Sequence, residues 1–209
     1  MPDKNNRKRA ASATIPEILP PNNDWIFKLL FGDKRNEHLL IGLLSSFIDL
    51  PEEEYELIFL DTHLKPETKE EKLGILDVKV KTTSGKILNI EIQVDPIKEI
   101  GKRISFYKSK LVVGQIKKSA KYPVIQDVIC ICITNHLLFP HAKEYLNKFL
   151  FMNPENNLLF DDIPEVIYTL EIPKLPVQDV GSAVWKWLQF LRSVTKEEFE
   201  MLAERSPAL

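Results

Sequence analysis

Two acidic residues on adjacent strand-like segments have the spacing that metal-assisted chemistry needs. Residues 74–94 form two runs of alternating apolar and polar residues around a Thr-Thr-Ser-Gly-Lys turn. Asp77 lies in the first run, and Glu91 lies in the second, with Gln93 two residues later. Because successive strand residues face opposite sides, we expect these three side chains on the polar face of one hairpin.

The register of this hairpin decides whether the two acids can meet. The apolar residues of both runs share one core only if the loop holds an odd number of residues. A three-residue loop centred on Gly85, with Gly85 near the left-handed region, predicts Asp77 opposite Gln93. The same loop predicts Lys79 opposite Glu91. Asp77 and Glu91 are then diagonal neighbours about 7–8 Å apart at Cα, and their side chains can converge on one cation.

The chemistry open to such a pair is that of a hard, oxygen-lined metal site. Two carboxylates and a backbone carbonyl suit Mg²⁺, which keeps several waters and also accepts phosphate oxygens. A bound metal acidifies water and neutralises charge on a phosphate under attack, and Gln93 lies on the correct face to hold that water. The alternative is a half-exposed hairpin face on which Lys79 and Glu91 form an ion pair worth under about 1 kcal/mol.

Length and composition indicate one globular domain of ordinary size. The chain has 209 residues, 44% of them hydrophobic, and a formal net charge of −2, so binding to nucleic acid would need a local basic patch. No apolar run reaches the roughly 18 residues that span a bilayer, and residues 1–21 lack the apolar centre of a signal peptide. Cys130 and Cys132 stand two apart, a poor disulfide geometry, and two buried free thiols favour a cytoplasmic location.

The elements that must position the acids follow from apolar spacing and turn residues. Helical spacing and capping residues predict helices at 25–32, 36–50, 95–119, 182–194 and 196–206. Alternating or continuous apolar runs predict strands at 54–64, in the hairpin 74–94, and at 122–135, 143–152 and 165–173. The continuous run within 122–135 predicts a strand buried on both faces in the middle of the sheet. This order indicates an α/β fold with a central mixed sheet flanked by helices.

Local signals refine the helix ends. Pro96 is expected in the first turn of the helix at 95–119. Thr195 and Glu198 form a capping-box pattern for the last helix. Asp24 is expected to cap the first helix. Residues 1–21 combine Lys and Arg with several prolines, a composition typical of a disordered basic arm.

The residues at the hairpin resemble the core of the PD-(D/E)xK nucleases. The resemblance begins with Asp77, followed by Glu91-x-Gln93 on a hairpin and then by a helix. Four phrases narrow it to the recombination-promoting nucleases and transposases of that superfamily: NDWIFKLLFGD, LDVKVKTTSGKILNIEIQ, RISFYKSKLV and TLEIPKL. It covers about residues 22–204. It implies a restriction-endonuclease-like domain at 22–178 and a C-terminal helical segment at 179–209 that is shorter than in related proteins, as in a truncated copy.

The resemblance also implies roles for the hairpin residues. Asp77 and Glu91 would ligate Mg²⁺ or Mn²⁺ together with the backbone carbonyl of Ile92. Gln93 occupies the position of the superfamily's lysine and completes the catalytic set. A glutamine can orient water, but it supplies no positive charge.

The missing charge is expected from the helix that follows the hairpin. Arg103, Lys108 and Lys110 are the candidates for DNA binding, and Arg103 and Lys108 are expected to reach phosphate or solvent. Tyr107 fits the apolar stripe of the same helix and is interpreted as structural. Asp24 is a further candidate acid, with the capping role as the favoured interpretation.

These residues together predict a Mg²⁺-dependent endodeoxyribonuclease associated with recombination or transposition. The resemblance implies in-line attack of metal-activated water on a phosphodiester. DNA is the expected partner, with a homodimer as a further expectation and no membrane association. Basic residues within 4–9 would add salt-sensitive phosphate contacts. The alternative function is a catalytically inactive nuclease fold that serves as a DNA-binding or protein-interaction module.

Overall fold

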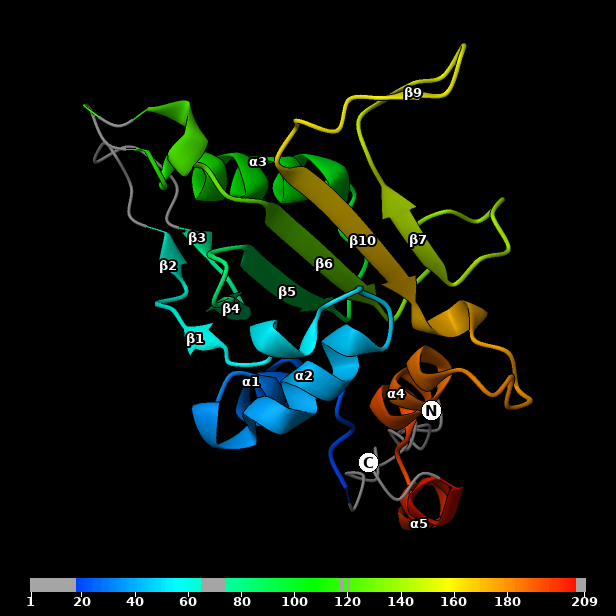
Figure 1. The fold of residues 1–209 in the computed structure, drawn as a ribbon. Helices are drawn as coiled ribbons and strands as arrows, with labels where there is room; N and C mark the ends of the chain where they lie inside the picture. Colours follow the sequence, from blue (N-terminus) through cyan, green and yellow to red (C-terminus); the bar gives the residue numbers. More distant parts are fainter. Residues whose placement is uncertain (1–17, 65–73, 117–118, 120, 206–209) are drawn as a thin grey trace, which may run out of the picture.

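A six-stranded mixed β-sheet forms the centre of the computed structural model, which describes residues 18–64, 74–116, 119 and 121–205 (Figure 1). In spatial order its strands are β1 (Ile58–Phe59), β4 (Val78–Lys81), β5 (Ile87–Gln93), β6 (Val128–Thr134), β10 (Glu165–Glu171) and β7 (Leu146–Phe149). The β5–β6 and β6–β10 pairs are parallel, and the other pairs are antiparallel. The predicted mixed sheet is therefore confirmed. Most of the predicted basic arm, residues 1–17, lies outside the described residues.

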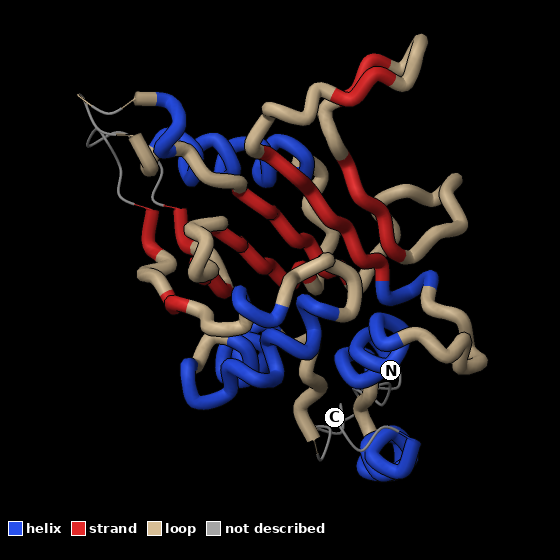
Figure 2. Tube along the Cα trace, in the orientation of Figure 1, coloured by secondary structure: helices blue, strands red, loops and turns tan. Residues whose placement is uncertain are grey.

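Helices cover both faces of this sheet (Figure 2). They are α1 (Asp24–Phe31), α2 (Glu37–Ser45), α3 (Ile100–Val113), α4 (Ala183–Arg192) and α5 (Lys196–Arg205). Helices α1, α2 and α4 pack on one face in the larger apolar cluster, whereas α3 packs on the other face in a smaller cluster. The α/β layers that the sequence indicates are thus present, with α3 on the face that carries the polar hairpin residues.

Short elements complete the fold. The described residues include four 3₁₀ turns: η1 (Lys34–Asn36), η2 (Glu52–Glu54), η3 (Tyr122–Val124) and η4 (Ile172–Lys174). Two small antiparallel pairs flank the sheet: β2 (His63–Leu64) with β3 (Gly74–Ile75), and β8 (Met152–Asn153) with β9 (Leu158–Leu159). The strands predicted at 54–64 and 143–152 are therefore each divided into two short pieces.

Strands β5 and β6 are buried on both faces. Every residue of β6 is buried, as the continuous apolar run predicts, and β5 is buried from Ile87 to Ile92. Leu88, Ile90 and Ile92 belong to the larger cluster, and Ile87 belongs to the cluster beneath α3. Because alternate residues of β5 face α3, the polar face of the hairpin is covered by a helix and is not a half-exposed surface.

The hairpin register differs by two residues from the predicted one. Val78 pairs with Ile90, and continuing this ladder by one step places Asp77 directly opposite Glu91. The loop does hold three residues, 83–85, closed by the Thr82 amide on the Lys86 carbonyl. Gly85, with φ of 96°, is the last residue of the loop and not its centre. A three-residue loop places its left-handed residue last, which explains why the prediction centred on Gly85 was wrong.

Two predicted helix starts are also corrected. Helix α3 begins at Ile100, so Pro96 lies before the helix and not in its first turn. Asn23 caps α1, because its side-chain oxygen accepts hydrogen bonds from the amides of Trp25 and Ile26. Asp24 is instead the first helical residue, and its side chain pairs with Lys28 one turn later on α1.

The capping box before α5 is confirmed. The Glu198 amide donates to Thr195 Oγ1 over 3.3 Å, and the Thr195 amide donates to Glu198 Oε2 over 3.1 Å. Cys130 and Cys132 are free and buried, as predicted. None of the helices in the described part of the chain is long and apolar enough to cross a membrane.

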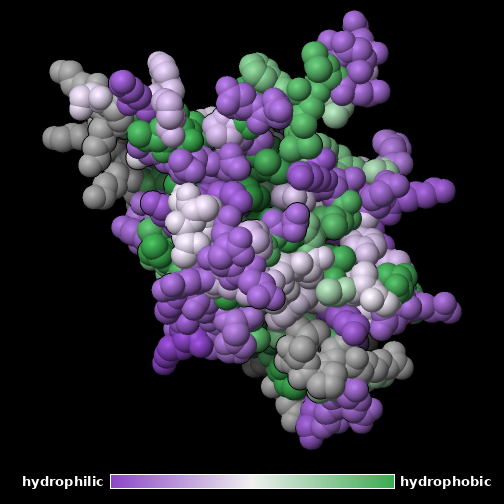
Figure 3. Space-filling view, viewed as in Figure 1, coloured by the Kyte–Doolittle hydropathy of each residue, from purple (hydrophilic) through white to green (hydrophobic). Residues whose placement is uncertain are grey.

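An apolar arm projects from the sheet between β7 and β10. It consists of β8, β9 and their flanking residues, and Figure 3 shows apolar surface along it. The exposed apolar residues of this arm are Phe149, Leu150, Phe151, Met152, Leu158, Leu159 and Phe160. Exposed apolar patches of this kind mark surfaces that contact other molecules.

Candidate active site

Asp77 stands at the bend just before β4, with its side chain only 10% exposed. Its Oδ2 accepts a hydrogen bond from the Ile92 amide over 3.0 Å, which ties β4 to β5 beyond their last ladder pair. Its Oδ1 lies 3.0 Å from the ammonium nitrogen of Lys28 on α1. Burial raises the pKa of Asp77 above its ordinary value, even though the Lys28 and Ile92 hydrogen bonds favour the ionised form.

Glu91 lies within β5 and is covered by α3. Its Oε1 accepts a hydrogen bond from the Asn89 side-chain amide over 3.2 Å, and its Oε2 lies 3.4 Å from Nε of Arg103 on α3. Burial raises the pKa of Glu91, and the charge of Asp77 raises it further, whereas Asn89 and Arg103 lower it. The Oδ1 atom of Asn89 and the Nε atom of Arg103 are buried without a hydrogen-bond partner, so this polar cluster beneath α3 is incompletely satisfied.

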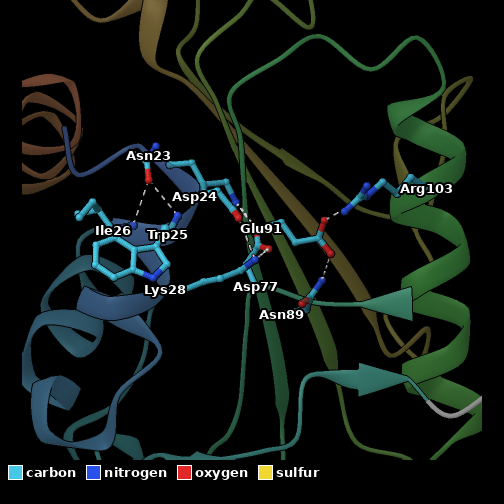
Figure 4. Close-up of polar contacts among 10 residues, drawn as sticks. Asn23, Asp24, Trp25, Ile26, Lys28, Asp77, Asn89, Glu91 and Arg103 are labelled. Atoms are coloured by element: carbon cyan, nitrogen blue, oxygen red, sulfur yellow. Dashed lines mark hydrogen bonds and ion pairs between the residues drawn. The ribbon is translucent and has the colours of Figure 1, made fainter. Parts of the chain in front are cut away.

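The two carboxylates face one gap between α1 and α3 (Figure 4). Asp77 is reached from the α1 side by Lys28, and Glu91 is reached from the α3 side by Arg103. The two acids therefore emerge on the same side of the sheet, from positions that lie opposite each other when the hairpin register is continued by one step. A buried pair of acids flanked by two cations is an arrangement that costs stability, which is typical of functional sites.

The residues present fit a divalent metal of the Mg²⁺ type. Within the described residues, no group of three or more His, Cys, Asp or Glu side chains is placed to hold a metal ion. A metal bound by Asp77 and Glu91 would therefore need a backbone carbonyl, water and phosphate oxygens, which is how Mg²⁺ is usually held. The Ile92 amide points to Asp77, and the carbonyl of a strand residue lies on the same side as its amide. Both acids are tied in place by other groups, so their positions are set before any ligand binds.

Gln93 extends from the end of β5, two residues after Glu91. Its Nε2 donates a hydrogen bond to the Asp95 carbonyl over 3.0 Å. The alternation of the strand places Gln93 and Glu91 on the same face, as predicted. Lys79 does not lie between the acids, because it pairs with Asn89 in the ladder and its ammonium lies 3.4 Å from the Asp61 carbonyl.

The three basic residues predicted on α3 are in different environments. The Arg103 guanidinium lies at the site and over the ring of Tyr107, 5.1 Å from the ring centroid. Lys108 is buried, and its ammonium lies 2.8 Å from Glu165 Oε2, so the expectation that it reaches phosphate or solvent is wrong. Lys110 lines a cavity of about 830 Å³ beside the C-terminal half of α3. Tyr107 is buried in the smaller cluster, in line with its structural interpretation.

Sequence reasoning missed two residues of this site. Lys28 contacts both Asp77 and Asp24, and its spacing of four from Asp24 on α1 was the available signal. Asn89 precedes Glu91 by two residues on the same face, but an amide on a polar hairpin face is unremarkable in a sequence. The burial of Lys108 could have been predicted, because Ile104 and Leu111 share its helical face.

A central mixed sheet, a hairpin that carries two opposed acids, and a following helix define the restriction-endonuclease-like class of nuclease folds. The family model described as "PD-(D/E)XK nuclease family transposase" matches residues 21–209. The chain therefore belongs to the PD-(D/E)XK nuclease family of transposases. Neither a search of curated proteins nor a search of solved structures gave a match.

Proposed function

We propose that this protein is a divalent-metal-dependent endodeoxyribonuclease that acts in recombination or transposition. The observation that carries the proposal is the pair of buried acids, Asp77 and Glu91, that face one gap from neighbouring strands. Burial raises the pKa of both acids, so the protein holds this negative charge at a cost that a bound cation would offset. Family membership supports the same reaction class.

Each residue of the site would have a separate role in hydrolysis. Asp77 and Glu91 would hold Mg²⁺ or Mn²⁺ together with the Ile92 carbonyl. A metal held there would supply Lewis-acid chemistry, by lowering the pKa of a bound water and offsetting charge on the phosphate. Gln93 orients the attacking water, and hydrolysis breaks the bond from phosphorus to the 3′ oxygen, which leaves a 3′-hydroxyl and a 5′-phosphate. Arg103, whose Nε lies 3.4 Å from Glu91 Oε2, would offer its remaining guanidinium nitrogens to a substrate phosphate.

DNA is the proposed substrate, and a second copy of the chain is the proposed partner. Arg103 lies at the site, and Lys110 and the basic residues within 4–9 remain candidates for DNA phosphate contacts. A double-strand break needs two sites, which a homodimer would supply. The apolar arm around β8 and β9 offers a surface for that contact, and size-exclusion chromatography with light scattering tests it. Two buried free thiols support a cytoplasmic location.

The experiment is a nicking assay on supercoiled plasmid with Mg²⁺ or Mn²⁺. We expect Asp77→Ala and Glu91→Ala each to lower the cleavage rate by about 10²–10³-fold, because each removes charge stabilisation at the reacting phosphate. Asp61→Ala, which changes an exposed acid paired with His63, is the matched control and should cut like the wild type.

Two results would contradict the proposal. One is cleavage that persists in both Asp77→Ala and Glu91→Ala, since a contaminating nuclease or another site would then be responsible. The other is the absence of cleavage at every divalent metal concentration. If DNA binding remained in that second case, the family fold would be acting as a binding module.

A further inference from the structure

Lys28 brings a positive charge to the oxygen of Asp77 that would ligate a metal. Asp77 Oδ2 is already held by the Ile92 amide, so Oδ1 is the atom left to face a cation. The ammonium nitrogen of Lys28 lies 3.0 Å from that Oδ1 and 3.1 Å from the carboxylate of Asp24. This ammonium therefore joins α1 to the site, as Figure 4 shows.

The hairpin itself supplies no comparable charge. Gln93 is neutral, and its side-chain nitrogen is engaged by the Asp95 carbonyl. The ammonium of Lys79 is directed to the Asp61 carbonyl, away from the two acids. Arg103 stands on the opposite side of the gap, next to Glu91. The side of the gap next to Asp77 thus obtains its cation from α1.

We propose that Lys28 contacts the scissile phosphate, and so supplies from α1 the charge that a lysine at the position of Gln93 would provide. This inference rests on the proposed nuclease function. Lys28 is 37% exposed at the rim of the site, and its flexible four-carbon stem allows the ammonium to turn from a carboxylate to a phosphate oxygen nearby. Asp24, one helical turn earlier on α1, keeps the ammonium at this rim.

The exchange of partners follows from simple electrostatics. A divalent ion and the Lys28 ammonium compete for the same oxygen, Asp77 Oδ1, and like charges repel at such short range. If a metal occupied Asp77 Oδ1, the Lys28 ammonium would lose this partner. It would then lie next to the DNA phosphate that binds with the metal. Lys28 would therefore oppose metal binding slightly and favour DNA binding.

The test compares Lys28→Met with the wild type in two binding measurements that do not need turnover. Fluorescence anisotropy with a labelled DNA duplex in Ca²⁺ should show about 5- to 10-fold weaker binding, and a salt slope reduced by about 1, because one phosphate contact is lost. Calorimetric titration with Mn²⁺ alone should show binding that is unchanged or up to about fivefold tighter, because the Lys28 ammonium no longer competes for Asp77 Oδ1.

Matched variants separate a phosphate contact from a structural role. Lys28→Arg keeps the charge and should recover most of the DNA affinity. Lys196→Met removes a lysine from another exposed pair with i,i+4 spacing, on α5, and should leave both measurements unchanged. A structural role predicts the opposite pattern, in which Lys28→Met weakens Mn²⁺ and DNA binding together and lowers the melting temperature.

Two results would overturn the proposal for Lys28. One is DNA affinity and salt slope equal to those of the wild type, and the other is loss of Mn²⁺ affinity in Lys28→Met. Asp77→Ala distinguishes these failures from failure of the proposed function. If Asp77→Ala retains wild-type Mn²⁺ affinity, the metal site itself is wrongly assigned. If it loses that affinity while Lys28→Met binds DNA normally, only the inference on Lys28 fails.

Discussion

Two lysine–carboxylate pairs in this protein differ in how completely their charges are satisfied. Glu171, at the end of β10, is fully buried, and its Oε2 accepts hydrogen bonds from the amides of Leu138 and Phe139 over 2.7 and 3.2 Å. Its Oε1 lies 2.7 Å from the ammonium of Lys174, which also donates to the Phe139 carbonyl over 2.8 Å. Both oxygens thus have fixed partners within the protein.

The pair formed by Asp77 and Lys28 is less complete. Asp77 Oδ2 has a fixed backbone donor, but Oδ1 depends on a lysine that is 37% exposed and shared with Asp24. Burial raises the pKa of Asp77, so the ionised form is held at a cost. The neighbouring Glu91 is in the same condition, with its pKa also raised by burial.

The difference indicates separate purposes for the two pairs. The Glu171 pair connects the loop after β6 to the end of β10 and contributes to folding. The Asp77 pair leaves buried negative charge that a cation can still approach, and sites of this kind lower stability in exchange for function. We therefore expect substitutions at the two pairs to have opposite balances of stability and activity.

The largest expected effect on stability is at Glu171. Glu171→Ala should lower the free energy of unfolding by about 3–5 kcal/mol, because it leaves the buried ammonium of Lys174 and two loop amides without their partner. Urea denaturation followed by circular dichroism measures this loss. Glu200→Ala, at an exposed pair with Lys196, is the control and should change little. A loss below 1 kcal/mol at Glu171 would remove the distinction between the two pairs.

The comparison also shows which features the sequence could predict. Apolar alternation predicted which residues of β4 and β5 face the larger cluster, and the continuous run predicted the double burial of β6. The alternation of apolar residues, however, requires only an odd number of loop residues. It cannot choose between a loop at 83–85 and one at 84–86. That choice shifted the partner of Asp77 from Gln93 to Glu91.

Contacts between distant elements were beyond the sequence patterns. The phrase TLEIPKL contains Glu171 and Lys174, and their spacing of three suggests an ordinary surface ion pair. The amides that bind Glu171 belong to the loop after β6, so the short phrase gives no sign of them. The sequence likewise predicts Lys28 as a solvated helix residue, because its contact with Asp77 exists only when α1 packs against the hairpin. The burial of Glu91 could not be read from the hairpin alone, because Arg103 of the distant helix α3 lies against its carboxylate.

A substitution at Glu91 is expected to raise the free energy of unfolding, whereas Glu171→Ala lowers it, and the change at Glu91 should be smaller. Because the folded-state pKa of Glu91 is raised, its contribution to stability is present below the unfolded pKa and is lost as the pH rises through the folded pKa. In EDTA-treated protein, Glu91→Gln should therefore be more stable than the wild type by about 0.5–2 kcal/mol at neutral to alkaline pH. The difference should shrink as the pH falls.

Thermal unfolding across pH, with EDTA present, measures this effect. Glu165→Gln serves as the control, since Glu165 is paired with the buried Lys108 on the same α3 face, and its loss should destabilise the protein. If Glu91→Gln were as destabilising as Glu165→Gln, Glu91 would belong with the structural acids. The site would then resemble the Glu171 pair and not differ from it.

The smallest expected effect on stability is at Asp24. Lys28 contacts both Asp24 and Asp77, and a substitution at Asp24 removes only the first of these contacts. Asp24 is 58% exposed and Lys28 is 37% exposed, so solvent screens their attraction. Asp24→Asn should change the free energy of unfolding by less than about 1 kcal/mol, and α1 keeps its cap because Asn23 provides it. Chemical denaturation with Asn23→Ala as the comparison, expected to cost about 1 kcal/mol, checks this order. A larger loss in Asp24→Asn than in Asn23→Ala would mean that the Lys28 contact holds the fold together, as the Lys174 contact does, and the contrast between the two pairs would fail.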